Sequence, residues 1–138
     1  MTGLSPARRV SINFAETHMS SGKTALVVEA EFLIALDLQR MLEAHGIAET
    51  LLARDAAEAE ELSARWPEVA LAVVEFRLDD QQAVDLLSAL QRDQVPTVAI
   101  TSDVELTHGI DGFATIPVLS KPLSEDQLAS AIHRIAGA

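Results

Sequence analysis

Short, continuous apolar runs alternate with amphipathic segments along most of this chain. The runs are rich in valine, leucine and isoleucine, which is typical of strands buried on both faces of a parallel sheet. The clearest run consists of four apolar residues, 71–74, and Glu75 follows it directly. Pro117 lies in the last run and cannot donate a hydrogen bond to a neighbouring strand, so this strand should lie at a sheet edge. The expected strands span residues 25–28, 47–53, 69–75, 96–100 and 116–119.

The segments between these runs carry apolar residues three and four positions apart, which is typical of helices that pack one face against a sheet. Asp55 with Glu58, and Ser124 with Gln127, match the capping-box pattern at the start of a helix. Residues 104–115 are interrupted by glycine and predict a single helical turn. The expected helices span residues 32–45, 55–66, 83–92 and 124 onward.

Strands that alternate with helices predict a parallel sheet with helices on both faces, a three-layer α/β/α architecture. Right-handed crossovers place the carboxyl ends of all parallel strands at one edge of the sheet. In open α/β sheets, ligand sites lie at this edge. Five polar or charged residues follow the expected strands and should converge there: Glu29, Glu31, Glu75, Thr101 and Lys121.

The regular alternation covers residues 23–138, which we expect to form one domain without internal repeats. Residues 1–22 form a polar leader that has no apolar run of the kind found in signal peptides. Met19 is a second candidate for the natural start of the protein. The leader contains alternating apolar residues that are compatible with one short strand, at Val10, Ile12 and Phe14.

The composition narrows the classes of function. A chain of 138 residues, 49% of them hydrophobic, suits one domain with a substantial core. The formal net charge of -11 argues against partners such as nucleic acid or an anionic membrane, because both require clustered Lys and Arg. No apolar run approaches the roughly 20 residues that span a bilayer. The chain has no cysteine, which excludes disulfides and thiol chemistry, and we expect a cytoplasmic protein.

The sequence offers little support for enzymatic chemistry. It lacks a glycine-rich phosphate loop and the Ser, His and Asp order of known hydrolases. Its histidines have no spacing typical of metal ligands. The remaining enzyme hypothesis uses Glu75 and Lys121 as an acid and base, and we expect instead that the chain is not an enzyme.

From residue 24 onward the chain resembles the receiver domains of two-component response regulators. The resemblance rests on the residues that follow the expected strands: acidic residues after the first strand, a carboxylate at the end of the third strand, a hydroxyl after the fourth strand and Lys-Pro after the fifth strand. Residues 25–38 and 118–123 are the most receiver-like segments. The resemblance implies a flavodoxin-like (CheY-like), doubly wound sheet of five parallel strands in the order 2-1-3-4-5.

In receiver domains, an aspartate at the end of the third strand accepts a phosphoryl group from a histidine kinase. Acidic residues after the first strand hold Mg²⁺, and a hydroxyl and a lysine bind the phosphate oxygens. The resemblance assigns the acceptor position to Glu75 and the acidic pocket to Glu29, with Glu31 beside it. It assigns the phosphate-binding positions to Thr101 and Lys121.

The sequence departs from the receiver pattern at three positions. Glu75 replaces the acceptor aspartate, and its extra methylene moves the carboxylate by about 1 Å, a misplacement that can cost about 10²-fold in rate. Ala30 occupies a metal-ligand position, so we expect no cofactor and weak or absent Mg²⁺ binding. Val118 occupies the position of an aromatic switch residue. We hypothesise that Arg77 enters the acidic pocket as a fixed positive charge; the alternative is an arginine that faces solvent.

These departures predict a signalling domain that binds proteins without a phosphorylation cycle. Glu75 either mimics part of the charge of a phosphate or forms a buried ion pair with Lys121 that maintains the fold. The alternative is a working receiver that a histidine kinase phosphorylates on Glu75 or on the nearby Asp79 or Asp80. The expected partners are a histidine kinase or a downstream regulator. A homodimer through the last strand and helix is one hypothesis for the assembly, and the sequence equally allows a chain that works alone.

Overall fold

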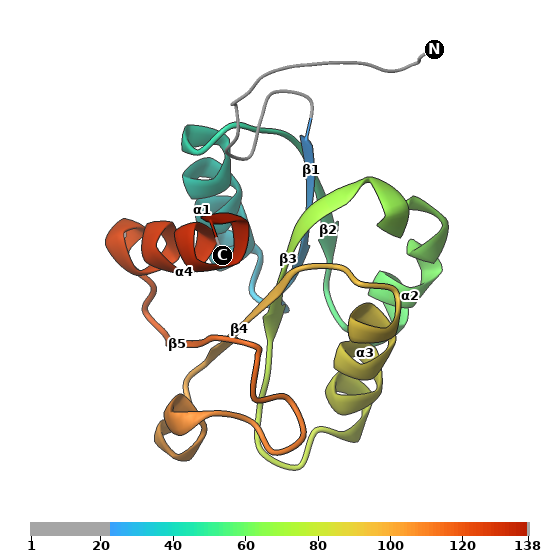
Figure 1. Ribbon diagram of the computed structural model, residues 1–138, viewed down its shortest axis with the longest axis vertical. Helices are drawn as coiled ribbons and strands as arrows, with labels where there is room; N and C mark the ends of the chain where they lie inside the picture. Colours follow the sequence, from blue (N-terminus) through green and yellow to red (C-terminus); the bar gives the residue numbers. More distant parts are fainter. Residues whose placement is uncertain (1–22, 138) are drawn as a thin grey trace.

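The computed structural model describes residues 23–137, which form a twisted sheet with helices on both sides (Figure 1). The sheet has five parallel strands in the order β2-β1-β3-β4-β5. This is the predicted flavodoxin-like order, and the three interior strands, β1, β3 and β4, are the ones that are buried over most of their length. The strands are β1 (Lys23–Val28), β2 (Ile47–Ala53), β3 (Val69–Glu75), β4 (Thr97–Thr101) and β5 (Val118–Ser120).

Helices α1 and α4 cover one face of the sheet, and α2 and α3 cover the other (Figure 1). In β1, Ala25 and Val27 pack on the side of α1 and α4, whereas Leu26 and Val28 pack on the side of α2 and α3. Successive side chains point to opposite faces of a strand, so a strand between two helical layers must be apolar throughout. The helices are α1 (Phe32–Ala44), α2 (Ala56–Glu61), η1 (Ser63–Glu68), α3 (Gln81–Arg92), η2 (Val104–His108) and α4 (Glu125–Gly137).

The parallel register aligns the carboxyl ends of the strands. Val28, the last residue of β1, is paired with Ala53 of β2 and with Val74 of β3. At the other side of the sheet, Thr101 of β4 is paired with Ser120 of β5. The residues that follow these ends therefore emerge together at one edge of the sheet.

The segment after β2 differs from the predicted single helix. α2 ends at Glu61, and the 3-10 helix η1 follows it. Pro67 lies inside η1, where it supplies no N–H and disfavours the α conformation of the preceding residue, so an α-helix cannot continue through it. Trp66 is nevertheless buried, and its indole N–H donates a hydrogen bond to the Ala59 carbonyl at 3.2 Å.

The structure confirms the predicted capping residues. The Asp55 side chain accepts the Glu58 N–H at 2.9 Å at the start of α2. At the start of α4, Ser124 and Gln127 form a complete capping box: each side chain accepts the other residue's backbone N–H at 3.1 Å. At α2 the box is incomplete, because Glu58 binds the backbone and side chain of Arg54 instead.

Other boundaries also differ from the predicted ones: β1 begins at Lys23 and not at residue 25, β4 spans Thr97–Thr101 and not 96–100, and β5 spans Val118–Ser120 and not 116–119. Helix α3 begins at Gln81 and not at residue 83, because the Asp80 side chain caps it by accepting the Ala83 N–H at 3.1 Å. Strand β5 is three residues long and lies at the sheet edge, as the position of Pro117 predicted. The single turn predicted within residues 104–115 is the 3-10 helix η2.

The expectations for the leader lie outside the described residues. They are the short strand at Val10, Ile12 and Phe14 and the start at Met19. Within the described part of the chain, no helix is both long enough and apolar enough to cross a membrane.

Candidate functional site

Lys121 is the central residue of a charged cluster at the carboxyl edge of the sheet. It follows β5, and its Nζ lies 3.1 Å from Glu29 Oε1, 3.2 Å from Glu75 Oε2 and 3.6 Å from Glu31 Oε1. Only 10% of the Lys121 side chain is exposed. A single, largely buried ammonium group therefore faces three carboxylates. We call these four residues the Lys121 cluster.

Glu75 is the last residue of β3 and is largely buried, with 16% of its side chain exposed. Its Oε1 accepts a hydrogen bond from the Ala30 N–H at 3.3 Å, and its Oε2 accepts one from Lys121 Nζ at 3.2 Å. The glutamate side chain thus reaches from β3 to the loop after β1. Both oxygens of this carboxylate are already engaged.

Glu29 directly follows β1, and its side chain has no exposed surface. Its Oε2 accepts the Glu31 N–H at 3.0 Å and lies 3.4 Å from Lys121 Nζ. Its Oε1 lies closer to Nζ, at 3.1 Å, but has no well-aligned hydrogen bond among the described residues. The ammonium charge of Lys121 therefore compensates this oxygen without a hydrogen bond of good geometry.

The cluster shifts the pKa values of its members in different directions. Burial raises the pKa of Glu29, and the nearby charge of Glu75 adds to this increase. Burial also raises the pKa of Glu75, but hydrogen bonds from the Ala30 N–H and from Lys121 outweigh burial and leave this pKa below its usual value. Burial lowers the pKa of Lys121, but its bonds to both glutamates outweigh burial and raise the pKa overall. Glu75 and Lys121 are therefore the firmly charged pair of the cluster.

Thr101 lies at the end of β4 and is fully buried. Its hydroxyl oxygen accepts the N–H of Asp103 at 3.0 Å, and no hydrogen bond joins it to Glu75 or Lys121. Its backbone carbonyl accepts the Lys121 N–H at 2.8 Å. Thr101 thus lies beside the Lys121 cluster, and its hydroxyl group holds the loop that follows β4. The contacts with Lys121 Nζ come from the carboxylates and not from this hydroxyl group.

Asp103 is a residue of this edge that the sequence analysis did not single out. Its Oδ2 accepts the N–H of Leu78 at 2.9 Å, which ties the loop after β4 to the loop after β3. The signal in the sequence is the run Thr101-Ser102-Asp103, because short polar side chains after a strand often bind nearby backbone groups.

Arg77 lies at the rim of the Lys121 cluster. Its Nε is 3.8 Å from Glu75 Oε2, and 64% of its side chain is exposed. Arg77 thus makes one long contact with Glu75 from the exposed rim and does not enter the pocket as hypothesised, because the buried cation between the two glutamates is Lys121. Beside Arg77, a small cavity of about 60 Å³ separates Glu75 from Asp80 and the start of α2.

No group of three or more His, Asp or Glu side chains in the described part of the chain is arranged to hold a metal ion. Ala30, at the position where receiver domains carry a second acidic ligand, contributes only its backbone N–H, which Glu75 accepts. Asp79 and Asp80 lie beyond the end of β3, and Asp80 is occupied as the cap of α3.

Comparisons with known proteins place this geometry in context. No family model and no curated protein match the chain, but solved structures match most of it. A sensor protein from Polaromonas sp. JS666 is 29% identical, with a TM-score of 0.69, over 84% of this chain and 97% of that one. The signal receiver domain of an HD domain-containing protein from Pseudomonas fluorescens Pf-5 is 25% identical, with a TM-score of 0.67, over 82% of this chain and 93% of that one.

A response regulator receiver domain protein from Clostridium thermocellum is 18% identical, with a TM-score of 0.70, over 83% of this chain and 94% of that one. At this identity the likeness shows the fold alone. The fold of residues 23–137 is therefore the flavodoxin-like fold of response regulator receiver domains, as the resemblance implied.

Proposed function

We propose that this chain is a receiver-like signalling domain that acts by binding a protein partner and does not pass through a phosphorylation cycle. The observation that carries the proposal is the position of Lys121, whose ammonium group lies within 3.2 Å of both Glu29 and Glu75. This buried ammonium group offsets the charge of both carboxylates from within the chain, so a divalent ion is not needed to compensate them.

The state of Glu75 supports a site that does not accept phosphoryl groups. A carboxylate that attacks a phosphorylated donor must direct an oxygen lone pair in line with the transferred group. Each Glu75 oxygen accepts one hydrogen bond, from the Ala30 N–H or from Lys121, so turning the carboxylate toward a donor would break a bond of the cluster. Glu75 acts here as a fixed negative charge that holds Lys121 and the loop after β1 in one arrangement.

The donors of the cluster suit Mg²⁺ poorly, so we propose that the domain works without a cofactor. Mg²⁺ requires near-octahedral oxygen ligation at about 2.0–2.1 Å. Glu29 and Glu75 share Lys121, and Ala30 has no side-chain oxygen to add. A Mg²⁺ ion would have to displace the buried ammonium group from both glutamates.

A signalling role is also supported by the two most similar of these structures, a sensor protein and a signal receiver domain. We propose a protein partner of the corresponding class, a histidine kinase or a downstream regulator. A homodimer through β5 and α4 is a further proposal, and the enzyme hypothesis based on Glu75 and Lys121 is not part of this function.

The test is incubation of the full chain with acetyl phosphate and Mg²⁺, followed by intact mass measurement, with amide NMR spectra recorded during a Mg²⁺ titration. We expect no added phosphoryl mass and no saturable shifts at Glu29, Glu75 or Thr101. The matched control is the double variant Ala30→Asp/Glu75→Asp, which restores the acidic groups of a receiver and should gain Mg²⁺-dependent shifts. A phosphoryl group on the unchanged chain would overturn the proposal and identify a working receiver.

A further inference from the structure

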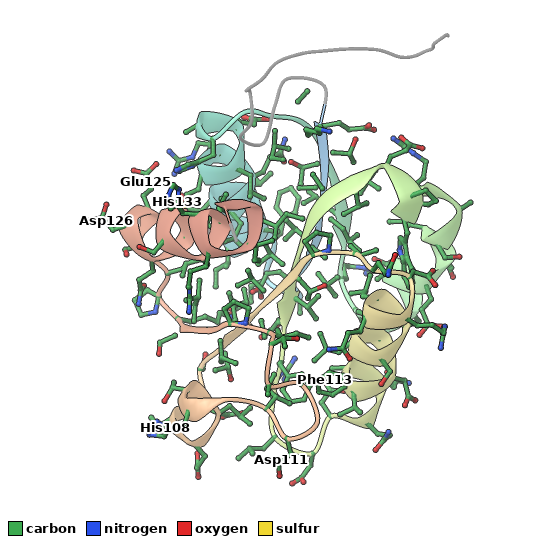
Figure 2. The ribbon with its side chains drawn as sticks, viewed as in Figure 1. His108, Asp111, Phe113, Glu125, Asp126 and His133 are labelled. Atoms are coloured by element: carbon green, nitrogen blue, oxygen red, sulfur yellow. The ribbon has the colours of Figure 1, made fainter. Side chains whose placement is uncertain are left out.

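A groove of about 600 Å³ opens between the start of α3 and η2, with the loop after η2 forming one wall. None of the residues that line it belongs to the Lys121 cluster. The groove exists because a short 3-10 helix and an irregular loop connect β4 to β5. In Figure 2, Asp111 lies at the tip of this loop and Phe113 points from the loop toward α3.

The groove combines an apolar floor with an acidic rim. Phe76, Leu106 and Ile110 form the buried part of the floor, and Leu78 at its side is 46% exposed. Four carboxylates stand around it, and neither Lys nor Arg lines it. None of the four forms an ion pair with a cation of the described residues. These carboxylates belong to Asp79, Asp80, Glu105 and Asp111.

The walls of the groove are held by hydrogen bonds. The Asp103 carboxylate accepts the Leu78 N–H at 2.9 Å, and this bond joins the η2 side to the α3 side. On the η2 side, the Thr107 hydroxyl donates to the Val104 carbonyl at 2.7 Å. Gly109 and Gly112 have φ values of +125° and +88°, which turn the loop after η2 without steric strain. The groove is thus a preformed surface.

The leader of this chain carries the complementary chemistry. Arg8 and Arg9 precede three apolar residues that alternate with polar ones, namely Val10, Ile12 and Phe14. Two arginines and one glutamate give residues 1–22 a formal charge of +1. The formal net charge of the whole chain is -11, so residues 23–138 together carry -12. A segment with adjacent arginines and spaced apolar side chains can satisfy the rim and the floor of this groove together.

The leader is long enough to reach the carboxyl edge of the sheet. Nine residues lead from Phe14 to Lys23, and such a segment spans up to about 30 Å when extended. Strand β1 begins at Lys23 and, with six residues, rises about 20 Å toward the edge where the groove lies. We propose that residues 8–14 of the same chain dock in the groove between α3 and η2, with Arg8 and Arg9 against the acidic rim and the apolar residues on the floor.

The absence of cysteine from the chain allows a direct test. The variant Ser11→Cys, made in the full chain, carries a nitroxide label on the polar side of the leader segment. We expect loss of amide NMR intensity at Leu78, Val84 and Ile110, with recovery after the label is reduced. Signals of Phe32 and Leu33 on the exposed face of α1 should keep their intensity.

Charge variants of the labelled chain test the recognition itself. Arg8→Ser/Arg9→Ser, or Asp79→Asn/Asp111→Asn in the groove, should restore the intensity, and so should high salt. The matched control is Asp126→Asn on α4, well apart from Asp111 in Figure 2, which should change nothing.

Three outcomes overturn the proposal. Uniform weak broadening shows that the segment does not dock, and broadening centred on Phe32 and Leu33 shows that it docks on α1. Broadening that appears in an isotope-labelled chain when a separate nitroxide-labelled chain is mixed with it shows that the groove binds a second copy.

Discussion

At the scale of single residues, the two buried glutamates of the Lys121 cluster contribute to stability with opposite signs. The pKa of Glu75 is lowered, so its ionised form favours folding: this contribution is present above about pH 4.3 and is lost as the pH falls through the folded-state pKa. The pKa of Glu29 is raised, so this residue favours folding only at low pH, and the benefit is lost as the pH rises through its folded-state pKa.

Glutamine substitutions should therefore separate the two residues at pH 7. Glu75→Gln removes a charged acceptor and should lower the free energy of unfolding by about 1.5–3 kcal/mol. Glu29→Gln removes a buried charge, and Lys121 retains its ion pair with Glu75. This variant should leave the free energy of unfolding unchanged or raise it by about 1 kcal/mol. Urea denaturation of the two variants measures both effects.

The two differences should also depend on pH in a defined way. The deficit of Glu75→Gln should shrink as the pH falls below the pKa of Glu75 in the unfolded chain. The advantage of Glu29→Gln should shrink as the pH falls through the raised pKa of Glu29 in the folded chain. Destabilisation of similar size by both variants at pH 7 would contradict the opposite pKa shifts.

Lys121 should produce an alkaline loss of stability. Its pKa is raised in the folded chain, so its contribution is complete below about pH 10.4 and is lost as the pH rises through the folded-state value. The chain has no tyrosine and no cysteine, which leaves few other groups to titrate in this range. Urea denaturation should be measured between pH 9 and pH 11.5, about one unit either side of the reference lysine pKa of about 10.4. The free energy of unfolding of the unchanged chain should fall across this range.

Variants of the two lysines of the chain provide the comparison. Lys23→Gln, at the exposed start of β1, should keep the alkaline loss. Lys121→Met should lack this loss and should already be less stable at pH 7 by about 3–5 kcal/mol, because it removes the buried ammonium group that Glu29 and Glu75 share. An alkaline loss that disappears with Lys23 and persists without Lys121 would refute this assignment.

At the scale of elements, the first turn of α4 depends on the reciprocal hydrogen bonds of Ser124 and Gln127. Ser124→Ala leaves the Gln127 N–H without its partner and should cost about 1 kcal/mol in urea denaturation. Ser130→Ala, at an exposed position inside α4, should be neutral or slightly stabilising because alanine has the higher helix propensity. Equal losses from both variants would show that the capping box does not hold the helix.

The elements could be predicted from the sequence where local and long-range preferences agree. The bounds of β2 and β3 match the prediction, because each strand is a bounded apolar or β-prone run between turn residues. The predicted start of α3 at residue 83 is two residues late, because the first turn begins with Gln81 and Gln82 and carries no apolar signal, while Asp80 caps it. The second helix changes to 3-10 geometry after Glu61, six residues before Pro67, and no residue pattern marks that point.

The convergence of the site could be predicted, but its individual contacts could not. Parallel topology alone brings Glu29, Glu75 and Lys121 to one edge of the sheet. That Thr101 binds the Asp103 N–H depends on the loop conformation after β4, which no residue pattern specified. The groove beside α3 was missed for the same reason, since it arises from the packing of irregular segments.

At the scale of the whole molecule, the sheet divides the core into two separate halves. Leu86 of α3 packs in the half under α2 and α3, whereas Ile132 of α4 packs in the half under α1 and α4. Leu86→Ala should cost about 2–5 kcal/mol and Ile132→Val about 0.5–1.5 kcal/mol. Because the two sites share no contacts across the sheet, the double variant should show the sum within about 0.5 kcal/mol in chemical denaturation. A clear deviation from additivity would indicate that the sheet transmits packing changes between its faces.

The long separation in sequence between Glu29 and Lys121 has a consequence for folding during synthesis on the ribosome. Glu29 and Lys121 are 92 positions apart, so a ribosome that adds about 5–20 residues per second produces the lysine roughly 5 to 20 s after the glutamate. During this interval the nascent strands carry acidic groups whose counter-charge has not yet been translated. The Lys121 cluster can therefore form only after β5 has been made, when α4 is the one described element that remains to be translated.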